Sequence, residues 1–516
     1  MRSKTIGLAI GLLLSVLIFS SVFAQERIYR DVIQKIKAEA YYNSQIMENA
    51  STIADVFGPR LAHSPSYLAC AKWVKEKFQE YGLSQAKLDP YGKFGVTWSN
   101  EFTSVHMMTP FYMPVIAYPN TWCRGTPGKI RGNVIYINFR EIAREADLAV
   151  YKDKLQDVII FTEEKQELRP NFEPLARRFT DDELKELEKD EIGRERDRRR
   201  SRERLSWDQI VDFVFAEGAA VIVVPDGREN YGTVMVNEVP GKAWEDLSSI
   251  HPPFLVMAAE HYNRIMRIIE KGKKVEMEVD LKISISNENR TDYNVIGDIP
   301  GSDLAKEVVM LGAHLDANSA GQGATDNATG CVVVMEAMRI LKTIGVEPRR
   351  TIRAALWGGE EYGLLGSKGY VKKHYGDSET QKYKKDHAHF SVYFNMDGGT
   401  GQFRGIYLQN NERVRPIFEE WMKPFHSLGM TCLSPRNRFN SDHTSFDAVG
   451  LPGFSFIQDP IERRAYHTNM DTYDRLLEED LIQAAVVMAS FVYHAAMQDE
   501  LIPRNAPMSV RLRGGR

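Results

Sequence analysis

The chain has 516 residues, of which 43% are hydrophobic and 26% are charged, and its formal net charge is −4. These values are typical of a folded protein that is long enough for more than one domain. Because the net charge is small, it favours neither a nucleic acid nor an acidic membrane surface as a partner, and we expect no nucleic acid partner.

The first residues have the three-part layout of a secretory signal peptide. Arg2 and Lys4 precede an apolar run over residues 6–19, and Ala24 provides a small residue for cleavage. A retained membrane anchor is the alternative, since the run approaches spanning length. We predict a signal peptide over residues 1–24 and an exported protein, periplasmic or extracellular. We expect no stable membrane insertion after signal cleavage, because no later segment is long and apolar enough.

Residues 25–113 are predicted to form the N-terminal part of a main domain. Apolar residues recur at helical spacing over residues 28–83, and the turn-forming sequence Gly58-Pro59-Arg60-Leu61 breaks this stretch in two. Residues 114–286 differ in composition, with short runs rich in β-branched residues. These runs lie at residues 134–137, 158–161 and 220–224. We predict an inserted β-rich domain over residues 114–286.

A charged insertion at residues 177–204 interrupts this β-rich part. Its run Arg198-Arg199-Arg200 could be taken for a nucleic-acid patch. Acidic residues are mixed through the segment, however, and no aromatic interleaving supports base stacking. We predict a solvated helical insertion that carries no chemistry.

Residues 287–500 alternate between strand-like and helix-like segments, and residues 501–516 are a predicted C-terminal tail. Strands are expected at residues 308–311, 352–357, 391–394 and 454–457, and helices at residues 331–341 and 481–497. This alternation predicts an α/β fold, with a mostly parallel mixed sheet and helices on both faces. In such sheets, sites form beyond the carboxyl ends of the strands.

Carboxylates and imidazoles follow the expected strands. They are His314 and Asp316 after the first strand, Asp326 at the start of the next helix, Glu360 and Glu361 after the second strand, Asp397 after the third, and His467 beyond the fourth. Nitrogen and oxygen ligands without cysteine suit zinc or a similar metal. The carboxylates are too many for one tetrahedral ion, and two adjacent metals would use them. Without cations, so many like charges in one cleft would resist ionising together.

Each of these residue types also has an ordinary structural use. A single histidine at a strand end is usually a hydrogen-bonding group, and paired glutamates usually lie on a solvated surface. An aspartate at a helix start is usually an N-cap, and Asp326 can be a cap as well as a ligand. The occurrence of the whole set, in order, at successive strand ends is what favours a metal site.

The ordered set resembles the co-catalytic zinc exopeptidases. The matching motifs are His314-x-Asp316, Asp326-Asn327-Ala328-x-Gly330, Glu360-Glu361, Asn395-Met396-Asp397 and Tyr466-His467-Thr468-x-x-Asp471-Thr472. This family includes bacterial leucyl aminopeptidases, glutamate carboxypeptidases and carboxypeptidase Q. The resemblance covers residues 294–498 and extends weakly to Gly58-Pro59-Arg60-Leu61. Residues 218–224 and 253–256 resemble parts of a protease-associated domain, the type of insert found in several of these relatives.

The resemblance implies two zinc ions per chain. His314 and Asp397 would bind one ion and Glu361 and His467 the other, with Asp326 bridging both.

The resemblance also implies roles around the metals. Asp316 would lie behind His314 and orient its ring. Glu360 would be the general base. Tyr466 would steady the tetrahedral oxyanion, with a core tyrosine as the alternative. The loop Ser441-Asp442-His443 is interpreted as structural or substrate-lining.

We therefore expect a metallo-exopeptidase that acts on short peptides, with the aminopeptidase type slightly preferred. A carboxypeptidase or dipeptidase is the main alternative, because Arg404, Arg436 and Arg438 lie in loops that could reach the crevice and bind a carboxylate. A glutaminyl cyclase and a catalytically inactive receptor-like relative are further alternatives. The inserted domain could serve dimerisation, so a homodimer is one of the expected alternatives for the assembly.

Overall fold

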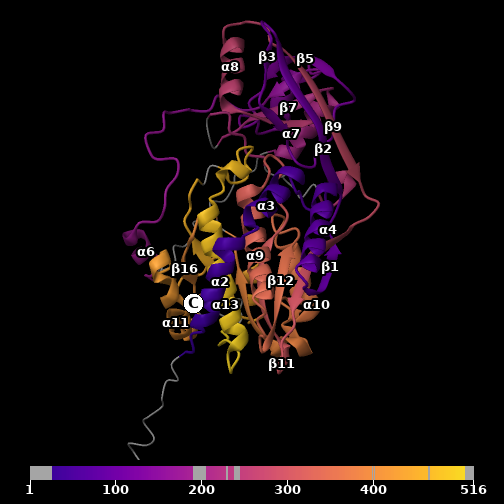
Figure 1. Ribbon diagram of the computed structural model, residues 1–516. Helices are drawn as coiled ribbons and strands as arrows, with labels where there is room; N and C mark the ends of the chain where they lie inside the picture. Colours follow the sequence, from indigo (N-terminus) through magenta and orange to yellow (C-terminus); the bar gives the residue numbers. More distant parts are fainter. Residues whose placement is uncertain are drawn as a thin grey trace, which may run out of the picture.

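The computed structural model describes residues 26–189, 205–227, 231–236, 244–397, 399, 401–462 and 465–505. The predicted signal peptide at residues 1–24 lies outside the described residues, as do residues 190–204 of the charged insertion and most of the C-terminal tail. The chain forms two units, one above the other in Figure 1. We call residues 26–96 and 287–505 the core unit, and residues 97–286 the outer unit.

The core unit is built on an eight-stranded sheet. Its strand order is β1 (Ser84–Lys93), β10 (Thr291–Ile299), β12 (Arg350–Trp357), β11 (Leu304–His314), β15 (Phe390–Asn395), β18 (Gly453–Gln458), β16 (Phe403–Tyr407) and β17 (Cys432–Ser434). The pairs β11–β12, β11–β15, β15–β18 and β16–β17 are parallel, and the other pairs are antiparallel. The predicted α/β fold with a mostly parallel mixed sheet is confirmed.

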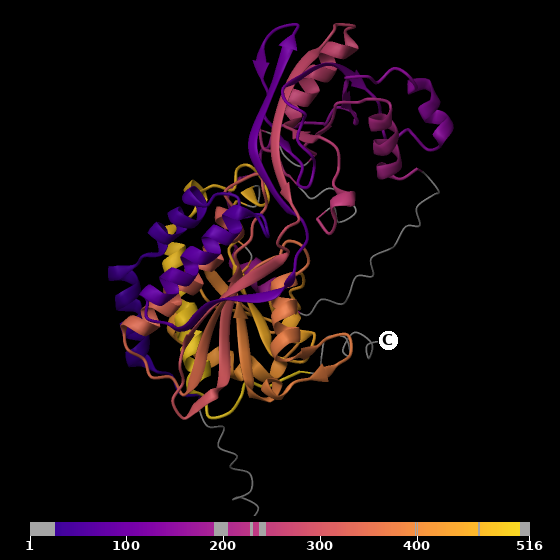
Figure 2. The same ribbon diagram turned by 90° about the vertical axis from the view of Figure 1, so that its right-hand side faces the viewer.

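Helices cover both faces of this sheet (Figure 2). One face packs against α4 (Pro65–Glu80), α9 (Thr329–Thr343) and α13 (Glu478–Met497), and the other against α10 (Leu365–His374) and α12 (His443–Asp447). Helix α2 (Arg30–Asn43) packs on the outside of α9 and α13. Along β11, Val309 and Leu311 belong to the first cluster and Met310 to the second. Because successive side chains of a strand point to opposite faces, covering both faces requires the unbroken apolar run seen in the sequence.

Helix α13 corrects the expectation that no later segment could span a membrane. Among the described residues, it is the one helix long and apolar enough to cross a bilayer. Its apolar residues pack inside the core unit, however, and 94% of the apolar window is buried. Length and composition alone therefore do not distinguish this core helix from a membrane span.

The outer unit has a second eight-stranded sheet. Its order is β3 (Met113–Pro114), β2 (Thr97–Thr109), β9 (Glu276–Ser286), β5 (Ile130–Tyr136), β6 (Ile159–Phe161), β7 (Val221–Pro225), β8 (Phe254–Met257) and β4 (Ala117–Pro119). Helices α7 (Trp207–Ala216) and α8 (Ala259–Glu270) pack on its opposite faces. The sheet begins at Thr97 rather than at the predicted residue 114, because β2 pairs with β9 along its whole length. The local composition of the sequence could not show the pairing of β2 with β9.

Four aromatic side chains lie where the two units meet. Phe94, at the end of the N-terminal part of the core unit, stacks on Trp244 with ring centroids 4.8 Å apart. Tyr362, which follows Glu361 in the chain, packs edge-on against Trp122 at 4.9 Å and against Trp244 at 6.0 Å. The outer unit is therefore packed against the loop that carries the paired glutamates.

A segment of the charged insertion reaches from the outer unit to the core unit. Helix α6 (Asp181–Leu187) lies beside β16 and β17, far from the rest of the outer unit (Figure 1). Leu184 is buried against Cys432 and Ile457. The predicted helix is present, and its charged residues are largely exposed as expected. The segment is not solvated on all sides, however, because Phe179, Leu184 and Leu187 form an apolar side that packs on the core unit. We call residues 175–189 the strap.

Candidate active site

The sheet topology brings the predicted site residues to one edge. His314 is the last residue of β11, while Glu360 and Glu361 follow β12 and Asp397 follows β15. These three neighbouring strands are parallel. Their carboxyl ends therefore open into one crevice, as expected for an open α/β sheet.

Asp326 lies between two histidines, and each of its carboxylate oxygens faces one of them. Its Oδ1 is 3.0 Å from His314 Nε2, and its Oδ2 is 2.8 Å from His467 Nε2. On the first side, Asp397 Oδ1 is 3.8 Å from His314 Nε2. On the second side, Glu361 Oε2 is 3.1 Å from His467 Nε2. The five predicted ligands thus form two sets of one histidine and one carboxylate, joined by Asp326.

The backbone around Asp326 is held by its neighbours. Asp471 accepts hydrogen bonds from the backbone N–H groups of Thr325 and Asp326, at 2.5 and 3.2 Å. Asn327 donates to the Met396 carbonyl and accepts from the Gly330 N–H, both at 2.9 Å. These contacts link the Asp326 turn to the loop of Asp397. They give a structural reason for the asparagine of the motif and for Asp471, to which the sequence analysis assigned no role.

Gly330 is the second residue of the buried helix α9, which follows this turn. A Cβ atom there would lie 2.5 Å from Asn327 Oδ1 and 2.7 Å from both Ala313 Cβ and the Met396 carbonyl oxygen. Real Cβ atoms do not approach other heavy atoms that closely. The glycine of the motif is therefore required by close packing between the helix start and β11.

Asp316 acts differently from the prediction. The contact within hydrogen-bonding distance of His314 Nδ1 is the backbone carbonyl of Asp316, at 2.9 Å, whereas its carboxylate Oδ1 is 3.8 Å away. That carboxylate instead accepts hydrogen bonds from the backbone N–H groups of Glu360 and Glu361, at 3.1 and 3.2 Å. The ring of His314 is thus oriented by a carbonyl, and the carboxylate of Asp316 positions the glutamate loop.

Burial governs the acidity of this loop. Burial raises the pKa of the Asp316 carboxyl to about 7. It also raises the pKa of Glu360 well above its ordinary range; the charge of His314 opposes this, while the nearby carboxylates of Asp397 and Asp442 add to it. A carboxylate in such surroundings takes up a proton more readily than one in water, which is what a general base requires.

The cluster contains buried polar atoms that the protein does not satisfy. Within the described part of the chain, Asp326 Oδ2, Glu361 Oε1 and His467 Nε2 are buried without a hydrogen-bond partner. Asp326 Oδ2 and His467 Nε2 are close enough to count as an ion pair, but they do not meet hydrogen-bond geometry. Ligand atoms of His314, Asp326 and Glu361 all lie within 4.8 Å of one another. Because buried polar atoms are costly unless they are satisfied, these residues fit a bound cation.

In the protein by itself, protonated histidines offset the negative charges of the carboxylates in this cluster. Burial by itself would lower the pKa of His467, but the nearby negative charges of Glu361 and Asp326 raise it to about 10. Burial by itself would raise the pKa of Asp326, but its contacts with His314 and His467 hold it well below its ordinary range. Since metal ligands must be deprotonated, a metal would displace protons from these histidines.

Tyr466 belongs to the site and not to a core. Its side chain is 38% exposed, and its ring stacks on His467 with centroids 4.1 Å apart. The nearby charge of Asp326, followed by burial, raises the pKa of its phenol, which keeps the hydroxyl protonated as a hydrogen-bond donor. The alternative of a core tyrosine is therefore wrong.

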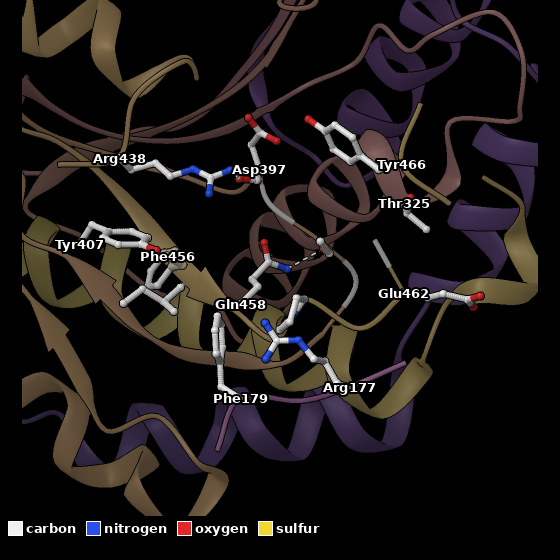
Figure 3. Close-up of a pocket in the computed structure, with 13 residues that line it drawn as sticks. Arg177, Phe179, Thr325, Asp397, Tyr407, Arg438, Phe456, Gln458, Glu462 and Tyr466 are labelled. Carbon is white, nitrogen blue, oxygen red and sulfur yellow. Dashed lines mark hydrogen bonds between the residues drawn. The ribbon is translucent and has the colours of Figure 1, made fainter. Parts of the chain in front are cut away.

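A pocket of about 380 Å³ opens beside the cluster. It is lined by Asp397 and Tyr466 from the site, by Tyr407, Arg438, Phe456 and Gln458 from the core unit, and by Arg177 and Phe179 from the strap (Figure 3). Of these lining residues outside the metal site, the sequence analysis had singled out only Arg438. The strap residues were missed because their segment looked like solvated charge.

The three arginines considered for carboxylate binding have different surroundings. Arg404 binds Asp459 and the Phe179 carbonyl, and Arg436 donates to carbonyls of the strap. Only Arg438 lines the pocket. The loop Ser441-Asp442-His443 is fully buried, and the Ser441 hydroxyl accepts a hydrogen bond from Asn395.

Known proteins share both the sequence pattern and the fold. Residues 294–492 match the model of Peptidase family M28. Human carboxypeptidase Q is 28% identical over 255 residues, which are 49% of this chain and 52% of that protein. The chain thus spans about half the length of the curated relatives it matches.

Two solved structures show the same fold. The peptidase M28 precursor from Shewanella amazonensis has a TM-score of 0.65 and 23% identity, and the match covers 92% of this chain and 98% of that one. BSAP, a zinc aminopeptidase from Bacillus subtilis, has a TM-score of 0.55 and 19% identity, covering 88% and 95%.

Residues 294–492, which the model of Peptidase family M28 matches, include all five predicted metal ligands. The predicted resemblance to the co-catalytic zinc exopeptidases is confirmed.

Proposed function

We propose that this protein is a zinc exopeptidase that holds two zinc ions and removes residues from the ends of short peptides. The observation that carries the proposal is the position of Asp326, with one carboxylate oxygen toward His314 and the other toward His467. A single metal would leave one of these sets unused. When bound, zinc supplies Lewis acidity toward a peptide carbonyl and lowers the pKa of water.

The surrounding residues have the properties that peptide hydrolysis needs. Glu360, in buried surroundings that raise its pKa, can take a proton from the attacking water and pass it to the leaving amine. The hydroxyl of Tyr466 is available to donate a hydrogen bond to the developing oxyanion. The carboxylate of Asp316 fixes the loop that presents Glu360.

We prefer an aminopeptidase, as the sequence analysis did, and the fold of a zinc aminopeptidase supports this preference. A carboxypeptidase or dipeptidase is the second candidate. One observation favours it, since the guanidinium of Arg438 lines the pocket beside Asp397, where it could bind a substrate carboxylate. We also propose that the protein is exported, on the strength of its signal-like N-terminus.

Peptides with one end blocked test these choices. The purified protein should hydrolyse free di- and tripeptides and should lose activity when zinc is removed by a chelator. An aminopeptidase should tolerate a C-terminal amide and reject an N-acetyl group, while a carboxypeptidase should show the reverse. Formation of pyroglutamate from N-terminal glutamine, without peptide hydrolysis, would support the glutaminyl cyclase alternative. No turnover of any peptide by the zinc-loaded protein would refute the proposal.

A further inference from the structure

The strap places an aromatic ring in the wall of the substrate pocket. Phe179 lines the pocket together with Tyr407 and Phe456, and the same pocket reaches Asp397 and Tyr466 of the site (Figure 3). Phe179 and Tyr407 are both half-buried and pack against the small cluster of Leu184, Cys432 and Ile457. The strap thus adds an apolar surface that the core unit does not provide by itself.

Ion pairs fasten the strap directly beside this ring. Arg178 binds Asp459 at 3.0 Å and Asp480 at 2.8 Å, and both carboxylates are buried. The Phe179 N–H donates to Asp459 at 2.8 Å, and its carbonyl accepts from Arg404 at 3.2 Å. Asp459 directly follows Gln458, another lining residue. The fastening point and the pocket wall are therefore parts of one connected arrangement.

Helix α6 provides a second attachment. Ser434 donates a hydrogen bond to the Leu187 carbonyl, the Cys432 thiol lies 3.5 Å from the Leu184 carbonyl, and Arg436 donates to the carbonyls of Glu186 and Lys189. The helix begins at a capping box formed by Thr180 and Glu183. Since the strap is attached on both sides of residue 180, Phe179 is a fixed wall of the pocket.

We propose that the strap determines which side chain the enzyme accepts. Phe179, with Tyr407 and Phe456, receives a bulky apolar side chain of a residue that flanks the cleaved bond, and Arg178 is the positioning residue that holds Phe179 in place. A pocket of about 380 Å³ is at the small end of ligand pockets, so it suits one residue of a peptide. Arg177, which also lines the pocket, is paired with Glu183 at 2.5 Å, so its charge is offset. This inference rests on the proposed peptidase activity.

Dipeptides that carry Phe, Leu, Glu or Gly at either position, with Ala at the other, test the proposal. For the wild type we expect kcat/KM to be at least about 10-fold higher for Phe or Leu than for Gly at one position, as is typical of apolar pockets. Phe179→Ala should lower kcat/KM for those substrates about 10-fold and change it less than about 3-fold for Gly. Phe172→Ala is the matched control, because Phe172 precedes the strap, is 91% exposed and does not line the pocket.

Two results would overturn the proposal. One is an equal loss for all side chains in Phe179→Ala, which would indicate a general structural role. The other is a wild-type preference for Glu, which would assign the pocket to an acidic side chain. If the wild type hydrolyses no dipeptide at all, the proposed function fails.

The role of Arg178 has a separate readout. In Arg178→Ala, hydrogen exchange of the backbone N–H groups of residues 179–187 should accelerate about 10-fold or more, and KM for Phe or Leu substrates should rise with kcat little changed. Arg178→Lys should recover part of the protection. Arg169→Ala, which removes an exposed arginine ahead of the strap, is the control. Unchanged exchange in Arg178→Ala would refute the fastening, whether or not the protein is a peptidase.

Discussion

Arg60 offers a test of how the metal loops are held in place. Its fully buried guanidinium donates five hydrogen bonds to backbone carbonyls. The acceptors are Ile53, Gly58, Leu315, Gln322 and Gly323, at 3.2, 3.0, 2.9, 2.8 and 2.8 Å. Leu315 adjoins His314 and Asp316, and Gly323 lies three residues before Asp326. A single side chain therefore ties together the two loops that carry His314 and Asp326.

Truncating this side chain should be costly. In Arg60→Ala each buried carbonyl loses its donor, at about 1 kcal/mol each, so we expect the free energy of unfolding to fall by about 4–5 kcal/mol. That is a large part of the total stability of a typical domain, about 5–15 kcal/mol. Arg60→Lys keeps the charge but has three donors without the planar fork, and should lose about half as much.

Denaturant unfolding and zinc titration together check this reasoning. Both variants should unfold at lower denaturant concentration than the wild type, and zinc affinity should fall about 10-fold or more in Arg60→Lys because the ligand loops are less well fixed. Unfolding of Arg60→Ala within about 1 kcal/mol of the wild type would refute the argument. So would a loss of stability in Arg60→Lys with unchanged zinc affinity, since it would separate Arg60 from the metal loops.

Three further predictions concern the site and the core. Metal analysis of the purified protein should find about two zinc ions per chain, and Asp326→Ala should lose both, because the bridging carboxylate serves both sets; retention of two ions in that variant would contradict the bridge. Glu360→Gln should keep the metals yet lose about 10²- to 10⁴-fold in kcat, measured on a dipeptide, and a near wild-type rate would reassign the base. Burial lowers the pKa of His494 to about 4, below the ordinary 6.5, so its contribution to stability is fully present above pH 6.5 and is lost as the pH falls toward 4. Since one pKa unit corresponds to about 1.4 kcal/mol, that loss should be about 3 kcal/mol, and denaturant unfolding of His494→Gln should show a correspondingly flatter pH dependence than the wild type.

The sequence by itself determined the four central strands of the sheet, β12, β11, β15 and β18, and the members of the site. Short unbroken apolar runs such as 308–311 favour strands covered on both faces, and each is followed by a residue of a type that can bind metals or protons. Because parallel strands end at one edge, the order of His314, Glu360, Glu361 and Asp397 along the chain was enough to predict that they meet. The chemistry of the set then indicated zinc or a similar metal, since it offers nitrogen and oxygen atoms but no thiolate.

Tertiary structure decided what depends on contacts between distant segments. Asp316 turns its carboxylate to the glutamate loop, 44 residues away in sequence, and leaves its carbonyl for His314. The strap became part of the pocket because Arg178 meets Asp459 and Asp480, about 300 residues later. A charged segment has no local pattern that reveals such partners, because an ion pair forms only where the fold brings its two members together. The sequence therefore showed which residues could do the chemistry, while only the fold showed what surrounds the substrate.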